Sequence, residues 1–80
     1  MSDHELKCWP EHYTPLAEGL KTAELRFNDR GYKAGDTLTL REYVPDTKIY
    51  TGQFVRRRIR HVADISAWAP GYVLLSLEEM

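Results

Sequence analysis

A group of polar residues between positions 19 and 30 has the spacing of a binding or catalytic site. Alternation along an extended strand would place Thr22, Glu24 and Arg26 on one face, with Lys21 leading into that strand. A cation, a hydroxyl, a carboxylate and a guanidinium gathered in this way can recognise a phosphate or a nucleic-acid base. The structural alternative is a solvent-facing strand surface whose ion pairs contribute about 0.2–1 kcal/mol each.

The same residues also have the functional groups needed for hydrolysis. Thr22 is a candidate nucleophile, and a desolvated Lys21 within hydrogen-bond distance could act as its base. Glu24 would then orient the reacting groups or transfer a proton. Catalysis by these three residues is therefore an alternative to binding alone.

Three residues near this group could extend a nucleotide-binding site. Arg30 could contact a phosphate, and the ring of Trp9 or Tyr32 could stack on a base. Each has a structural alternative, because Arg30 could pair with Asp29 and the two aromatic rings could pack in the core or at its rim.

A second basic cluster lies near position 58, where four of the eleven basic residues fall within positions 56–60. Alternation places Arg56, Arg58 and Arg60 in a stripe with neighbours about 7 Å apart, which is close to nucleotide spacing. This stripe predicts salt-dependent contacts to a sugar-phosphate backbone. The alternative is a solvated strand face whose arginines pair with acids such as Glu42 or Asp46.

The spacing of His4, Cys8 and His12 is the only pattern that resembles a metal site. On one continuous helix these three residues would share a face. The local sequence instead predicts a strand, then Pro10, then a helix, so no metal site and no cofactor are predicted. Cys8 is expected to be a small buried hydrophobe and not a reactive thiol.

Length and composition narrow the class of protein. Eighty residues predict a single domain over positions 1–80, and 42 % hydrophobic with 29 % charged residues favours a folded chain over a disordered one. The net charge of −1 indicates no particular partner. One cysteine excludes an intramolecular disulfide, and no apolar run approaches the roughly 18 residues of a membrane span. A cytoplasmic protein without a membrane partner is therefore expected.

The elements that position these residues follow from local patterns. Alternation predicts a strand over 4–9, with His4, Leu6 and Cys8 on one face. Pro10 and Gly19 delimit a predicted helix over 10–18. A strand over 22–27 is predicted to be half buried, with an apolar face and an entirely polar one.

The second half of the chain predicts a long hairpin and a final strand. A strand over 37–43 leads to a hairpin tip bracketed by turn residues at 45–47 and 51–52, and the return strand covers 53–63. The last strand covers 72–77. Together these elements predict an α+β fold, a small mixed β-barrel of five to six strands with one or two short helices.

The segment at 19–26, GLKTAELR, resembles the G-x-K-T-x-E-x-R signature of the ASCH domains, which belong to the PUA-like superfamily of small barrels associated with RNA. Segments 4–7, 28–30, 35–38, 40–43, 50–52 and 71–74 resemble a short, uncharacterised ASCH-like subfamily of bacteria and bacteriophages. The resemblance implies a PUA-like barrel in which Lys21, Glu24 and Arg26 line a cleft for a nucleotide or an RNA segment.

Some ASCH relatives hydrolyse the amide of acetylated cytidine nucleosides with a lysine, a threonine and a distant glutamate. The lysine is retained as Lys21, but Glu24 occupies the threonine position, and this short sequence has no counterpart of the helical insertion that carries the glutamate. An RNA- or nucleotide-binding module is therefore the first hypothesis. A small amidohydrolase of acetylated cytidine and a protein-interaction module are the alternatives.

Overall fold

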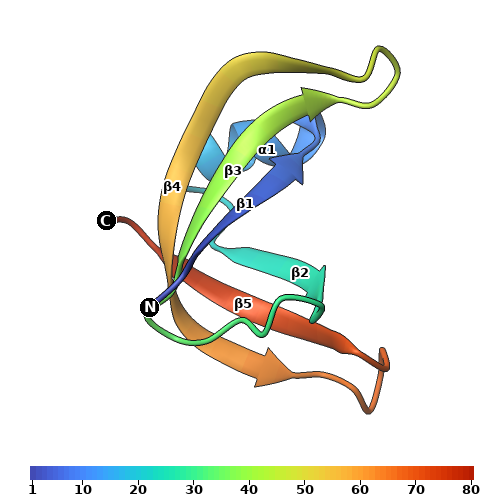
Figure 1. Ribbon diagram of the computed structural model, residues 1–80. Coiled ribbons are helices and arrows are strands. Elements are labelled where there is room, and N and C mark those ends of the chain that lie inside the picture. The colour runs from blue at the N-terminus through green and yellow to red at the C-terminus, as the bar shows by residue number, and fades with distance from the viewer.

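The computed structural model describes residues 1–80 and contains five strands and one helix (Figure 1). In chain order these are β1 (Asp3–Cys8), α1 (Pro10–Ala17), β2 (Ala23–Phe27), β3 (Thr37–Val44), β4 (Ile49–Asp64) and β5 (Tyr72–Glu78). The strands form a curled half-barrel, so the predicted small, barrel-like α+β fold is confirmed. None of its helices has the length and apolar character needed to cross a membrane.

The sheet has the strand order β1-β3-β4-β5-β2. β1 runs parallel to β3, and the other neighbouring pairs are antiparallel. The long strand β4 pairs with β3 along its first half and with β5 along its second half, and it curves between them (Figure 1). The two edge strands, β1 and β2, do not pair with each other, so the half-barrel has an open seam between them.

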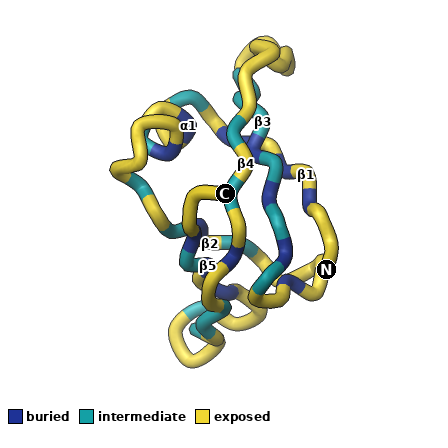
Figure 2. The backbone as a smooth tube through the Cα atoms, turned by 90° about the vertical axis from the view of Figure 1, so that its left-hand side faces the viewer, coloured by how far each residue is buried: buried dark blue, intermediate teal, exposed yellow.

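The core side chains come from α1, from Tyr32 in the loop before β3, and from the strands β1, β3, β4 and β5, whose buried positions are dark blue in Figure 2. Alternation along β1 buries His4, Leu6 and Cys8, as the sequence predicts. The helix α1 begins at Pro10 and is followed by Gly19 in the left-handed region at φ 79°, and it buries two side chains against the sheet. The largest fully buried side chains are Leu16, Leu38, Leu40, Ile59 and Leu75.

The prediction that the apolar face of β2 is the buried one is wrong. Glu24 is only 5 % exposed, whereas Leu25 is 54 % exposed. The register explains the reversal, because Glu24 lies opposite the buried Leu75 and Leu25 lies opposite the exposed Leu74. The polar face of β2 therefore points to the inside of the half-barrel, and its apolar face lies outside.

The expected hairpin tip is also partly wrong. Thr51 and Gly52 lie within β4, and the turn itself is confined to residues 45–48, where the Lys48 N–H donates to the Val44 carbonyl at 2.8 Å. Further along β4, the register shifts between Ile59 and His61. This irregularity brings Val62 against the core, although simple alternation predicts that it shares the face of the arginines.

Candidate functional site

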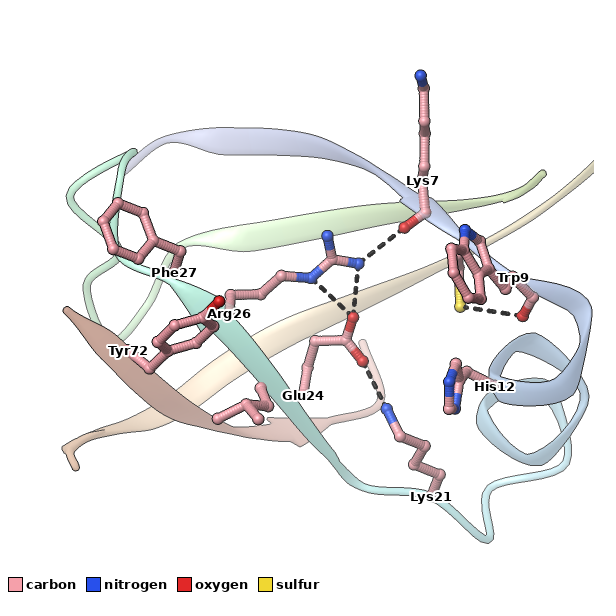
Figure 3. A pocket seen from close by; sticks show the side chains of 10 residues that line it. Lys7, Trp9, His12, Lys21, Glu24, Arg26, Phe27 and Tyr72 are labelled. Atoms are coloured by element: carbon pink, nitrogen blue, oxygen red, sulfur yellow. Dashed lines mark hydrogen bonds and ion pairs between the residues drawn. The ribbon is translucent and has the colours of Figure 1, made fainter. Parts of the chain in front are cut away.

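A cavity of about 600 Å³ opens at the seam between β1 and β2 (Figure 3). The end of β1, the start of α1, Lys21 shortly before β2 and the strand β2 itself form most of its wall. The lining residues are Lys7, Cys8, Trp9, His12, Lys21, Glu24, Leu25, Arg26, Phe27 and Tyr72. The cavity thus lies where the two unpaired edges of the sheet face each other.

Glu24 is the centre of the polar wall. The Lys21 ammonium donates to its Oε1 at 2.5 Å, and the Arg26 guanidinium donates to its Oε2 from Nε at 2.9 Å and from Nη2 at 2.6 Å (Figure 3). The Glu24 side chain is only 7 % exposed. A carboxylate this deeply buried requires such partners, because an unpaired buried charge is strongly destabilising. The structure therefore brings together the lysine, glutamate and arginine that the sequence singles out.

Arg26 also connects the two edges of the sheet. Its Nη2 donates to the main-chain carbonyl of Lys7 on β1 at 2.7 Å. The Lys7 ammonium points away from the cavity and lies 4.6 Å from the centre of the Tyr43 ring (Figure 3). Lys7 therefore contributes main chain, and not its charge, to this polar contact.

Trp9 and His12 form another side of the cavity, one helical turn apart at the start of α1. Trp9 is half exposed. His12 also lines the cavity, although the sequence pattern singled it out only as a possible metal ligand. Its position beside Trp9 could have been predicted, because residues three apart at the start of a helix lie on the same side.

Cys8 lines the same cavity but is buried, as the sequence predicts. Burial, with a smaller contribution from the nearby Glu24 charge, raises the pKa of its thiol to about 11. The thiol is therefore protonated at neutral pH and is a poor nucleophile.

Three of the predicted residues lie elsewhere. Thr22 is exposed just before β2 and lines a separate hollow of about 220 Å³. Arg30 follows β2 in a loop, where its Nε lies 4.0 Å from Oδ1 of Asp29. Tyr32 is 5 % exposed and packs edge to face against His4, so it is a core residue and does not offer a free ring face for stacking.

The arginine stripe lies away from the cavity. Arg56, Arg58 and Arg60 are exposed on β4, which is the central strand of the sheet and two strands from either side of the seam. The nearest acid to Arg56 is Asp3, with Nη2 and Oδ1 3.8 Å apart, and not Glu42 or Asp46. One small ligand therefore cannot contact both the stripe and the cavity wall.

Arg57 points to the opposite side of β4 from this stripe. Its Nη2 donates to the main-chain carbonyl of Leu16 at 2.8 Å, near the end of α1. The same carbonyl also accepts the Gly19 N–H at 3.1 Å, so Arg57 adds a second hydrogen bond, and its positive charge complements the helix dipole. Arg57 is therefore a structural residue within the basic cluster.

His4, the first residue of the possible metal pattern, makes a structural contact. Its Nε2 lies 2.9 Å from Oδ2 of the buried Asp36. Oδ1 of the same carboxylate accepts the main-chain N–H of Ser2, and Oδ2 also accepts that of Lys33. These bonds, above all the one to His4, lower the pKa of Asp36. The structure contains no group of three or more His, Cys, Asp or Glu residues placed to hold a metal ion.

Comparison with known proteins adds two findings. The chain is 44 % identical over 72 residues to a protein of Escherichia phage P2 described as an uncharacterized 12.9 kDa protein in GpA 3'region. The match covers 90 % of this chain and 64 % of the phage protein. Residues 3–77 match a family described as a domain of unknown function, DUF3850. Since this match spans nearly all of the chain, the protein belongs to the DUF3850 family.

Proposed function

We propose that this chain is an ASCH-like domain of the PUA-like type, and that its seam cavity binds one nucleotide unit, either free or within single-stranded RNA. The observation that carries the proposal is the convergence of Lys21, Glu24 and Arg26 on one cavity wall. These are the residues that the ASCH resemblance associates with the cleft. The single buried cysteine fits a reducing, cytoplasmic setting for this activity.

The size and chemistry of the cavity support a small polar ligand. Its volume of about 600 Å³ lies within the range of about 300–1,000 Å³ that is typical of small-molecule sites. Its wall combines apolar surface with a few convergent charged groups, as such sites commonly do. A base with its sugar matches this combination of an apolar ring and polar edges.

Trp9 supports a base as part of the ligand. Its indole ring is half exposed at the cavity, on the side across from Phe27 and Tyr72 (Figure 3). Proteins that bind single-stranded RNA stack unpaired bases on such rings, whereas a paired base cannot leave its helix without a cost. Single-stranded RNA or a free nucleotide is therefore preferred to a duplex.

The geometry favours binding over hydrolysis. The candidate nucleophile Thr22 does not line the cavity, and the Lys21 ammonium is already bonded to Glu24. Hydrolysis of acetylated cytidine would need another nucleophile, such as water. Product formation is therefore a separate outcome to be watched for in the binding experiment.

The experiment is an amide-resolved NMR titration at low salt with a short single-stranded RNA, with cytidine and with acetylated cytidine, each followed for several hours. Shifts should group at Lys21, Glu24 and Arg26 and at the indole N–H of Trp9. Trp9→Leu should weaken binding. The matched control is Trp68→Leu, because Trp68 is 82 % exposed and lies outside the cavity.

Two results would contradict this proposal. If no ligand moved any resonance, both the binding and the hydrolytic hypothesis would fail, and a protein partner would be the next candidate. If shifts from RNA were confined to the arginine stripe on β4, the cavity would not be the binding site. Release of acetate with the cavity shifts would add a reaction to the binding.

A further inference from the structure

The hydrogen bonds around Glu24 leave free N–H donors for a ligand but no free carboxylate oxygen. Both carboxylate oxygens already accept hydrogen bonds from cations, and the side chain is nearly inaccessible. Of the three N–H groups of Lys21, one is used in this contact. The Nη1 of Arg26 makes no hydrogen bond within the protein, because Nε and Nη2 make all of its contacts. The polar wall therefore has free hydrogen-bond donors for a ligand, whereas its one carboxylate is already paired.

The net charge of the cavity wall also favours an anionic ligand. Lys21 and Arg26 each contribute a positive charge and Glu24 a negative one, so the triad has a net charge of +1. Glu24 is the only acidic residue of the lining. The Trp9 indole has one N–H donor and no hydrogen-bond acceptor, so it adds no acceptor to the cavity wall. An anionic group rich in acceptor atoms is the natural complement of this wall.

We infer that the cavity binds the phosphate of its ligand through the free N–H groups of Lys21 and of Arg26 Nη1, and so selects a nucleotide over the corresponding nucleoside. This inference rests on the proposed function and names the part of the ligand that is recognised. A guanidinium and an ammonium both donate charge-assisted hydrogen bonds to phosphate oxygens. Glu24 acts as a positioning residue that holds the two cations in place before the ligand arrives, which lowers the entropy lost on binding.

Recognition of a base amine by Glu24 is the competing expectation, and the structure argues against it. Such an amine would need a free acceptor, but each Glu24 oxygen is occupied by a cation at 2.5–2.9 Å. Binding the amine would break one of these charge-assisted bonds in a buried place, at a large cost. A phosphate can instead use the N–H groups that are still available and leave the triad intact.

The test compares cytidine 5′-monophosphate, cytidine and inorganic phosphate by NMR titration at fixed low salt. The nucleotide should bind at least about tenfold tighter than the nucleoside, because hydrogen bonds between charged groups are the stronger kind. Lys21→Met should remove most of this preference, and Lys21→Arg should retain it. Lys33→Met is the matched control, since Lys33 is exposed and lies outside the cavity. Dispersed amide spectra would show that each variant is folded.

The outcomes separate this inference from the proposed function. Equal affinity for the nucleotide and the nucleoside, with shifts at the cavity, would overturn phosphate selection and leave nucleotide-unit binding in place. Absence of binding by every ligand would overturn both. An unchanged preference in a folded Lys21→Met variant would also overturn the assignment of the phosphate to Lys21 and Arg26.

Discussion

The Arg26 guanidinium on β2 donates a hydrogen bond to the main-chain carbonyl of Lys7 on β1, at 2.7 Å. The two strands are the edges of the sheet and share no ladder of main-chain hydrogen bonds. A side chain therefore joins the edges of the half-barrel at the place where a closed barrel would have strand pairing. Because the same guanidinium holds Glu24, the seam and the polar wall of the cavity depend on one residue.

Arg26→Met should destabilise the protein. The substitution leaves the buried Glu24 carboxylate with a single cation and frees the Lys7 carbonyl, so we expect a loss of about 1–3 kcal/mol. Thermal unfolding should show a midpoint lower by several degrees, and hydrogen exchange should become faster at the end of β1. Arg30→Met should have little effect, since Arg30 is exposed and pairs only with its neighbour Asp29. Equal midpoints for the two variants would show that the bridge contributes nothing.

Glu24→Gln should separate stability from anion binding. The substitution removes the counter-charge that Lys21 and Arg26 share, which should lower the free energy of unfolding by about 1–3 kcal/mol. The same change raises the net charge of the triad, so cytidine 5′-monophosphate should bind more tightly and with a steeper dependence on salt. Weaker binding of the nucleotide by the folded variant would mean that the positioning of the two cations by Glu24 outweighs the gain in net positive charge.

Asp36 should make the fold sensitive to acid. Hydrogen bonds from His4 and from main-chain N–H groups lower its pKa below the ordinary value of 3.8. A carboxyl group whose pKa is lower in the folded state stabilises the fold above its unfolded pKa, and this stabilisation is lost as the pH falls through its folded pKa. Urea unfolding from pH 6 to pH 2 should show this loss below about pH 4. Asp36→Asn should remove it, whereas Asp46→Asn at the exposed hairpin tip should not.

Cys8 should be protected in the native protein. Its pKa of about 11, compared with an ordinary value of 9.0, predicts slow reaction with a thiol reagent at pH 7.5 and rapid reaction in denaturant. Because the folded state holds the proton more tightly, Cys8 should also stabilise the fold below pH 9 and lose that contribution as the pH rises from 9 to 11. Equal labelling rates in the native and denatured protein would contradict its burial.

The arginines of β4 should divide into two classes. Arg57→Ala removes the hydrogen bond to the Leu16 carbonyl and should lower stability by about 1 kcal/mol. Arg58→Ala changes an exposed side chain without an ion-pair partner and should leave the unfolding midpoint unchanged. Thermal unfolding of both variants provides the comparison, and a larger loss for Arg58→Ala would reverse this assignment.

Much of the fold could be predicted from local patterns in the sequence. The alternation of β1 and its buried face, the helix between Pro10 and Gly19, and the final strand agree with the structure. These features depend on backbone preferences and side-chain periodicity within a few residues, which a sequence displays directly. The clustering of Lys21, Glu24 and Arg26 has the same local origin, since they lie on one short segment.

The tertiary structure decided which face of β2 is buried and which residues share the cavity. Local alternation separates Glu24 from Leu25 but does not say which of them faces inward, because that depends on the register with β5. The strand order likewise places the arginine stripe of β4 far from the seam and brings Trp9 and His12 to it. Both results arise from pairing between distant segments, whose free energy depends on packing across the whole sheet and not on any one stretch of sequence.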